Sequence, residues 1–333
     1  MSKSITSNPS FGAETSAEEV AASLSSHITG KVILVTGVTP GGLGAHFVEV
    51  SAAHKPKLLI LAGRDPSKLA ESTKAIESAH PDVKTRALEL DLSSQAKVRK
   101  AAEEVLSWSE PIDLLVNNAA IMAAPYQKTV DGLESQFGTN HIGHFLFTNL
   151  IMPKILQSKS PRIVNVSSSG HRLSAIRWDD LDFKDGKEYN KWAAYGQAKT
   201  ANILFSVALA EKLGSKGLTA FSLHPGVIST NLARFVSESM EKDFAELHEL
   251  DKQLGNKEGN ASLSDIKWKT LTQGTATHVV AAFDPALARH NGVFLIDCQL
   301  APDDDIKPYA LDKTNAERLW KLSEDIVGQK FTY

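Results

Sequence analysis

The sequence predicts an α/β fold with one doubly wound parallel sheet of about seven strands and helices on both faces. From Lys31 onward, short runs of Val, Ile and Leu alternate with longer segments of helical periodicity. The runs are almost continuously apolar, which is typical of strands buried on both faces of a parallel sheet. Strands that alternate with helices indicate a doubly wound fold. Since no repeat or long linker divides this region, we expect one domain over residues 31–333.

The apolar runs give the expected strands, and the segments between them give the helices. The strands are Val32–Val35, Leu58–Ala62, Ala87–Leu90, Leu114–Val116, Ile163–Val166, Ala220–Leu223 and Val293–Ile296. The clearest helices are Ala45–Ala53, Pro66–Ala79 and Ser94–Ser107.

Three segments stand apart from this alternation. Residues 1–30 are expected to be an extension with a short helix, because Ser16 and Glu19 have the spacing of a capping box. Residues 172–191 are polar with scattered aromatics, and residues 232–267 are rich in Glu and Lys. We interpret both as insertions over the rim of the sheet.

Composition excludes several classes of function. The 333 residues carry a net charge of -3, without the basic patch of a nucleic-acid-binding protein. The sequence has neither a signal-like apolar run nor a stretch approaching the roughly 20 apolar residues that span a bilayer. These features predict a cytoplasmic protein with no membrane and no nucleic-acid partner. Cys298 is the single cysteine and is expected to be a small core residue.

A glycine-rich segment connects the first strand to the first helix. Its glycines fit neither common spacing of dinucleotide-binding turns, since a Gly-x-x-x-Gly-x-Gly count from Gly37 reaches Leu43. Aligned from the helix, Gly42 and Gly44 permit close approach of a ligand, and one extra residue falls within 39–41. A helix N-terminus with unpaired amides favours a pyrophosphate at this place. A purely structural turn is the alternative.

Tyr195 and Lys199 lie four residues apart in a helix-like segment, so their side chains share one face. A nearby ammonium favours the phenolate and thereby suits a tyrosine for acid/base chemistry. Upstream, Ser167, Ser168 and Ser169 end a buried strand at the edge where doubly wound sheets bind ligands. A serine there can donate a hydrogen bond to a substrate carbonyl, although capping serines are the structural alternative.

Together these motifs resemble the short-chain dehydrogenase/reductase family, which has a Rossmann fold, over about Lys31–Ile296. Within the family the chain is similar to the branch that contains the retinol dehydrogenases and the WW-domain oxidoreductase. It departs from the pattern by the extra residue in the glycine turn and by Ala120, where glycine is usual. The matching positions are Thr36, Gly37, Asp91, Leu92, Asn117–Ala120, Asn140, Ser168, Tyr195, Lys199, Pro225, Gly226 and Thr230.

The resemblance implies hydride transfer between a nicotinamide and the carbonyl or alcohol carbon of a small apolar or mid-sized ketone, aldehyde or secondary alcohol. Tyr195 would exchange the proton, and Lys199 would lower its pKa and hold the ribose. Ser168 would polarise the carbonyl, with Ser169 left open, and Asn140 would order a relay water. The implied cofactor-binding residues are Gly37, Thr39, Gly42, Leu43, Gly44, Arg64, Asp91, Leu92, Asn118, Ala119, Tyr195, Lys199, Pro225, Ile228 and Thr230.

The residue after the second strand predicts NADP(H) as the cofactor. An NAD enzyme is expected to place an acid there, on the adenosine ribose. This chain has Arg64, whose guanidinium can grip a 2′-phosphate. Asp65 could bind a ribose hydroxyl instead, but we expect it to cap the helix that begins at Pro66.

Other functions are less consistent with the sequence. A serine hydrolase lacks its Gly-x-Ser-x-Gly motif here, and His141 with His144 lacks a third metal ligand, so no metal is expected. The remaining alternatives are a dinucleotide-binding regulatory protein without turnover and an epimerase using the Tyr–Lys pair. The partner expected is a small-molecule carbonyl or alcohol, and a homo-oligomer is left open. The aromatic residues of the insertions either line an apolar pocket or anchor the insertions: Trp178, Phe183, Tyr189, Trp192 and Phe235.

Overall fold

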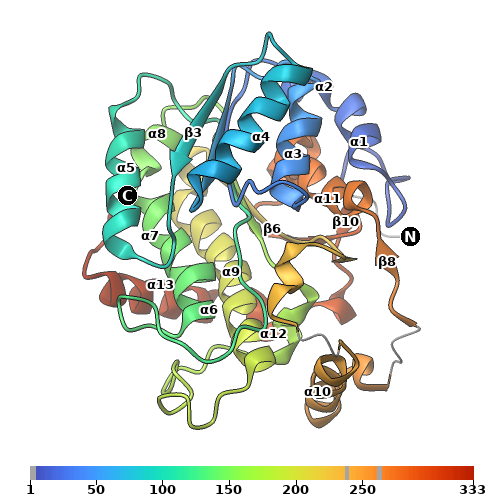
Figure 1. The fold of residues 1–333 in the computed structure, drawn as a ribbon, viewed down its shortest axis with the longest axis vertical. Coiled ribbons are helices and arrows are strands. Elements are labelled where there is room, and N and C mark those ends of the chain that lie inside the picture. The colour runs from blue at the N-terminus through green and yellow to red at the C-terminus, as the bar shows by residue number, and fades with distance from the viewer. Residues whose placement is uncertain (1–4, 237–239, 261–264) are drawn as a thin grey trace.

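The central element of the fold is an eight-stranded sheet (Figure 1). The strands are β1 (Val32–Thr36), β2 (Leu58–Gly63), β3 (Thr85–Glu89), β4 (Leu114–Asn117), β5 (Arg162–Val166), β6 (Thr219–His224), β9 (Phe294–Ile296) and β10 (Gln299–Leu300). They lie in the order β10-β9-β6-β5-β4-β1-β2-β3. The computed structural model describes residues 5–236, 240–260 and 265–333.

The sheet has one more strand than the sequence predicts. The seven predicted strands are all present and parallel, and β10 adds an antiparallel eighth. After β9 the chain reverses at Asp297 and Cys298, whose φ angles are 51° and 63°. Two consecutive positive φ angles are typical of tight hairpin turns. The Cys298 side chain is buried, as expected, although it belongs to this turn.

Helices cover both faces of the sheet. They are α3 (Leu43–Ala52), α4 (Pro66–Ala79), α5 (Gln95–Ser107), α6 (Ser135–Phe137), α7 (Gly143–Leu150), α8 (Met152–Ile155), α9 (Lys191–Leu213), α11 (Leu271–Phe283), α12 (Pro308–Leu311) and α13 (Lys313–Val327). Leu34 of β1 lies in one apolar cluster with residues of α5, α7, α9 and α13. Ile33 and Val35 lie in a second cluster with residues of α3, α4 and α11. This alternation confirms the predicted doubly wound fold.

The strand order places a change of direction between β1 and β4. From β1 the chain builds outward through β2 to β3, and it then returns to the other side of β1 and builds through β4, β5 and β6. Ligands of doubly wound folds bind where the order reverses, beyond the carboxyl ends of the strands. The glycine turn, the serines and Tyr195 all belong to segments near this edge.

The N-terminal segment packs against the second face. It contains α1 (Ala17–Ser23) and α2 (Ser25–Ile28). The predicted capping box is present, because the Ser16 hydroxyl accepts from Glu19 N and the Glu19 carboxylate accepts from Ser16 N. Ala17 N donates to Thr272 Oγ1 of α11 over 2.9 Å, and Val20 is fully buried. The short helix α1 therefore packs against α11, one of the helices that cover this face of the sheet.

The two predicted insertions contact each other beyond the sheet. The first ends at Asn190, whose side chain caps α9. The second includes α10 (Met240–Gln253), which lies outside the helical layers (Figure 1). Arg172 forms an ion pair of 2.6 Å with the fully buried Asp251 of α10. Of the second insertion, residues 237–239 and 261–264 lie outside the described residues. Two short parallel strands, β7 (Val227–Ile228) and β8 (Trp268–Lys269), pair with each other just before and just after this insertion.

Candidate active site

A cavity of about 1320 Å³ runs along the carboxyl edge of the sheet. It is lined by residues that follow β1, β2, β4, β5 and β6 and by residues of α9 and the second insertion. Ligand pockets usually measure about 300–1,000 Å³. The cavity therefore has room for a dinucleotide together with a small substrate.

The glycine turn forms one end of the cavity. Gly37 has a φ of 75°, and a Cβ there would lie 2.7 Å from Ala119 Cα, so no other residue fits. The extra residue forms a second tight turn in which Gly42 N donates to Thr39 O and Gly41 has a φ of 75°. Leu43 then opens α3, and no side chain caps this helix. The first amides of α3 therefore stay available to an anion.

Asn118 holds the glycine turn against the end of β4. Its Nδ2 donates to the carbonyls of Thr36 (2.9 Å) and Gly37 (3.3 Å). The amides of Asn118 and Ala119 both donate to Thr36 Oγ1. A Cβ on Gly44 would lie 2.5 Å from Asn118 Nδ2, which explains why glycine occupies this position. The sequence suggested a cofactor contact for Asn118, and the structure adds this bracing of the turn.

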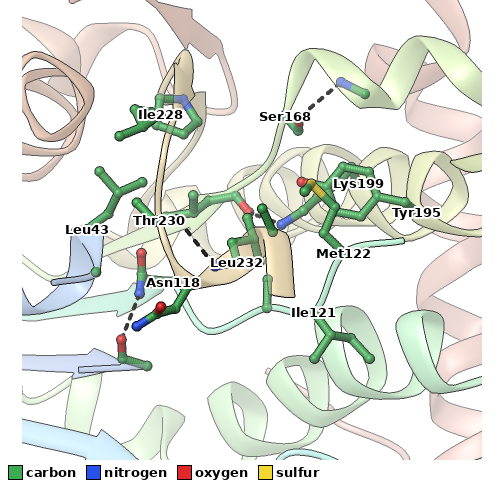
Figure 2. A pocket seen from close by; sticks show the side chains of 18 of the residues that line it. Leu43, Asn118, Ile121, Met122, Ser168, Tyr195, Lys199, Ile228, Thr230 and Leu232 are labelled. Atoms are coloured by element: carbon green, nitrogen blue, oxygen red, sulfur yellow. Dashed lines mark hydrogen bonds between the residues drawn. The ribbon is translucent and has the colours of Figure 1, made fainter. Parts of the chain in front are cut away.

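Tyr195 and Lys199 project from α9 into the cavity, and Ser168 approaches from the segment after β5 (Figure 2). Lys199 Nζ lies 5.6 Å from the centre of the Tyr195 ring and donates to Val166 O over 2.9 Å. Burial raises the pKa of Tyr195 to about 12, opposed by a hydrogen bond with Ser168. Burial also lowers the pKa of Lys199 to about 7. Without a ligand, burial therefore outweighs the tuning of Tyr195 by Lys199 that the resemblance implies.

The three serines have different surroundings. Ser167 is buried and donates to the carbonyl of Lys199 over 2.7 Å, so it ties β5 to α9. Ser168 Oγ accepts from Gly170 N and also bonds with Tyr195. Ser169 begins a short 3-10 helix, Ser169–Leu173, and lines the cavity. Only Ser168 therefore combines a place in the cavity with a bond to the phenol.

Asn140 lies in a π-helical turn, Gly138–Ile142, immediately before α7. Its side-chain amide is bonded at both atoms to the same residue, since Oδ1 accepts from Ile121 N and Nδ2 donates to Ile121 O, both at 2.9 Å. Its carbonyl accepts from Asn202 Nδ2 over 2.8 Å, and His144 Nδ1 lies 3.0 Å away. The Asn140 side chain thus fixes the loop after β4.

His141 and His144 point to different partners and do not form a common site. His141 Nε2 lies 2.8 Å from Ser323 Oγ, and His144 Nε2 lies 2.8 Å from Thr36 Oγ1. Burial lowers the pKa of His141 to about 3 and that of His144 to about 4. In residues 5–236, 240–260 and 265–333, no cluster of three or more His, Cys, Asp or Glu could hold a metal ion.

The residues after β2 and β3 line the same cavity. Arg64 follows β2, and the Asp65 carboxylate accepts from the amides of Ser67 and Lys68, which is the capping role expected of it. Burial acts to raise the pKa of Asp91, but hydrogen bonds from Ser93 and Lys97 hold that pKa below its usual value. Leu92 lies beside Asp91 in the cavity wall.

The segment after β6 covers the cavity from the opposite side. Pro225, Ile228 and Thr230, which the resemblance implies as cofactor contacts, all line it. In Figure 2, Ile228 and Thr230 lie on the strand and loop that face Leu43 and Asn118. Thr230 Oγ1 accepts from Leu232 N and so begins the 3-10 helix Asn231–Phe235. The cavity is therefore enclosed between this segment and the glycine turn.

Sequence reasoning did not identify many residues of the cavity wall, among them His224, Arg234 and Glu14. His224 ends β6, lines the cavity, and its Nδ1 is buried without a hydrogen-bond partner among the described residues. Its position directly before Pro225 was the available signal. Arg234 lies in the second insertion, and Glu14 lies in the N-terminal segment. No motif marks either of them.

Some aromatic residues of the insertions line the cavity, and the others anchor the insertions to the core. Trp192 and Phe235 line the cavity. Trp178 packs on the core beneath Arg318, and Phe183 is 1% exposed. The Tyr189 hydroxyl donates to Ala124 O. Anchoring thus accounts for three of the five residues.

Comparison with known proteins identifies the family. Residues 31–179 match the family described as short chain dehydrogenase. The chain is 35% identical over 328 residues to the short-chain dehydrogenase TIC 32 A, chloroplastic, of Brassica napus, with 95% of this chain and 94% of that protein covered. The chain belongs to the short-chain dehydrogenase/reductase family. Its fold is that of this family of oxidoreductases.

Further relatives agree with the branch expected from the sequence. The family member described here is 34% identical over 315 residues to retinol dehydrogenase 14 of Homo sapiens, with 90% of this chain and 87% of that protein covered. A solved structure of an uncharacterized protein from Mycobacterium Paratuberculosis matches with a TM-score of 0.69 and 29% identity, covering 92% of this chain and 96% of that chain. In the part of the chain that the structure describes, no helix is long and apolar enough to cross a membrane.

Proposed function

We propose that this short-chain dehydrogenase/reductase is an NADP(H)-dependent oxidoreductase that interconverts a ketone or aldehyde with an alcohol. The observation that carries the proposal is the grouping of Ser168, Tyr195 and Lys199 around one cavity. The phenol is buried and bonded to a serine hydroxyl. This arrangement can exchange a proton with a substrate oxygen and bind that oxygen at the same time.

The cavity suits a dinucleotide. The uncapped first turn of α3 offers free amides to a pyrophosphate, and Gly42 lets the ligand approach without steric hindrance. Leu43, Ile228 and Thr230 would enclose the cofactor between the glycine turn and the segment after β6. Bound cofactor would supply the hydride acceptor or donor at its nicotinamide.

Each side chain then has a definite role. Tyr195 would give its phenolic proton to the carbonyl oxygen during reduction and take it back during oxidation. Ser168 would hold that oxygen by a hydrogen bond and orient it toward the phenol. Lys199 would bind the ribose hydroxyls, and its charge would stabilise the phenolate. Asn140 would act as a positioning residue, because its side chain fixes the loop at Ile121.

The test of the proposed function is a substrate screen of the purified protein with NADPH. Aldehydes, ketones and secondary alcohols of graded size are offered, and NADPH absorbance is followed. Because relatives are described as retinol dehydrogenases, retinaldehyde is included, with its product analysed by chromatography. A protein that binds NADPH but turns over none of these compounds would refute the proposal and favour a regulatory role.

Tyr195→Phe is the variant that tests the mechanism. It removes the ionisable oxygen and keeps the ring, so we expect kcat to fall by roughly 10²- to 10⁴-fold while cofactor affinity stays nearly unchanged. Steady-state kinetics and calorimetry measure the two quantities. A variant that keeps most of its kcat would remove Tyr195 from the mechanism.

Arg64→Ala tests the cofactor preference. Arg64 follows β2, where the adenosine ribose is expected, and charge-assisted contacts contribute about 1.5–3 kcal/mol. We therefore expect the preference for NADP(H) over NAD(H) in kcat/KM to fall by about 10- to 150-fold. Equal use of both cofactors by the wild type contradicts the NADP(H) proposal.

A further inference from the structure

A second arginine shares the cavity with Arg64. Arg234 belongs to the 3-10 helix Asn231–Phe235, which follows the cavity-lining residue Thr230. The two arginines are 170 positions apart in the sequence, and both line the cavity. The fold therefore brings the two arginines near each other, and no local sequence pattern predicts that they are close.

Neither arginine has a carboxylate partner in the part of the chain that the structure describes. Arg64 makes neither a hydrogen bond nor an ion pair within residues 5–236, 240–260 and 265–333. Among the described residues, Arg234 donates to Asn231 O alone, over 3.2 Å, and its guanidinium stacks 4.8 Å from the centre of the Phe235 ring. By contrast, the Arg172 guanidinium is bonded to Asp251. The cavity arginines thus keep most of their donors free.

The two guanidinium groups are close enough to repel each other. Burial, and in addition the positive charge of Arg64, lower the pKa of Arg234. The nearest acid in sequence, Asp65, is occupied by the amides of Ser67 and Lys68 at the start of α4. Two neighbouring guanidinium groups that no described carboxylate pairs with form a site that an anion with several oxygens would stabilise.

The position of Arg64 indicates which anion this is. In a doubly wound fold, the residue after the second strand faces the ribose of the adenosine, whereas the pyrophosphate lies at the glycine turn. The anion that both arginines can reach is therefore a phosphate on the ribose. A phosphate monoester carries close to two negative charges near neutral pH and has three acceptor oxygens, enough for two guanidinium groups.

We propose that Arg234 and Arg64 together clamp the 2′-phosphate of NADP(H), and that Arg234 is a specificity-determining residue for the cofactor. This inference rests on the proposed function, since it needs a nicotinamide dinucleotide in the cavity. Phe235 lies in the same 3-10 helix as Arg234 and lines the cavity.

Calorimetry on the full chain tests the clamp. The ligands are NADP⁺, NAD⁺, adenosine 2′,5′-bisphosphate and adenosine 5′-monophosphate, and the variants are Arg234→Gln, Arg234→Lys and Arg64→Gln. We expect Arg234→Gln to weaken NADP⁺ and the bisphosphate by about 10-fold or more and to change NAD⁺ and the monophosphate less than about twofold. Arg234→Lys should fall between, because it keeps the charge and loses the fork.

The control variant is Arg289→Gln. Arg289 also ends a 3-10 helix, Pro285–Arg289, and is exposed outside the cavity, so we expect all four affinities to stay unchanged. Thermal melting of each variant shows whether it is folded, and Arg234→Lys provides the comparison if Arg234→Gln is not.

The outcomes separate this inference from the proposed function. A wild type that binds neither dinucleotide refutes the proposed function itself, and one that binds both equally refutes its NADP(H) preference. A wild type that prefers NADP⁺, with the same preference in Arg234→Gln, overturns the clamp alone. Equal weakening of NADP⁺ and NAD⁺ in Arg234→Gln also overturns it, because Arg234 would then contact a part that the two cofactors share.

Discussion

Burial sets the protonation states of the two central side chains in opposite directions. The pKa of Tyr195 is raised to about 12 and that of Lys199 is lowered to about 7, in each case because burial disfavours the charged form. Near neutral pH the unliganded site therefore holds a protonated phenol beside a partly ionised amine. Such a site is ready to donate a proton. To accept a proton, Tyr195 must first be a phenolate, and this requires a bound ligand that stabilises the positive charge on Lys199.

The lowered pKa of Lys199 predicts a pH dependence of stability. In the unfolded chain Lys199 has its ordinary pKa of 10.5, so between pH 7 and 10.5 the unfolded state binds more protons than the folded state. The stability contribution of Lys199 therefore rises with pH in this window, by up to about 1.4 kcal/mol per pH unit. Below about pH 7 both states are protonated, and the full cost of burying the charge is present.

Lys199→Met removes this ionisation and serves as the comparison. We expect the free energy of unfolding of the unliganded wild type, relative to the variant, to increase from pH 7 to 9. Denaturant titrations at several pH values measure it. The lost bond to Val166 O gives an offset that does not change with pH. Parallel pH profiles of the two proteins would contradict the burial effect.

At the scale of single elements, the start of α3 is the most constrained part of the site. Gly44 packs on Asn118, and a Cβ there would also lie 2.8 Å from Gly37 O. We expect Gly44→Val to displace Asn118 from the carbonyl of Thr36, to destabilise the fold by about 1–3 kcal/mol and to abolish tight cofactor binding. Thermal unfolding and NADP⁺ calorimetry measure these losses.

Gly12→Val is the matched control for Gly44→Val. A Cβ on Gly12 would have no atom within 4 Å, and its φ is not in the left-handed region. We expect this variant to change stability by less than about 0.5 kcal/mol. If Gly44→Val binds NADP⁺ as well as Gly12→Val does, the packing of α3 on Asn118 does not shape the cofactor site.

Elements with a strong local pattern could be predicted, and those held by distant contacts could not. The apolar runs located all seven parallel strands, and the spacing of Tyr195 and Lys199 placed both on α9. The two-residue strand β10 is too short to show a period of two. The π-helical turn at Asn140 depends on its bonds to Ile121 and Asn202, which no local pattern records.

The same distinction applies to the cavity wall. Arg64 could be proposed because it directly follows a recognisable strand. Arg234 lies in the second insertion, whose sequence shows no recognisable pattern. Arg234 comes close to Arg64 only in the folded chain.

On the scale of the whole molecule, the two ends of the chain complete the two apolar layers. Residues of α13 belong to the cluster beneath α5, α7 and α9, whereas residues of α1 belong to the cluster beneath α3 and α11. In Figure 1, α1 and α13 accordingly lie far apart on the molecule. The N-terminal segment also reaches the cavity, because Ala13 and Glu14 line it. Residues before the first strand thus contribute both to the core and to the site.

Two truncations separate these contributions. Deleting residues 2–15 removes Ala13 and Glu14 from the cavity wall but keeps α1 and α2 with their buried side chains. Deleting residues 2–28 also removes Val20 and Ile28, both 0% exposed. Full burial of such side chains contributes about 1.5–3 kcal/mol each, so we expect the longer deletion to destabilise the protein by several kcal/mol more than the shorter one. Thermal unfolding compares the two, and NADP⁺ calorimetry on the shorter deletion reports the loss of the cavity wall. Equal unfolding temperatures for both truncations would mean that α1 and α2 add nothing to the core, despite the complete burial of Val20 and Ile28.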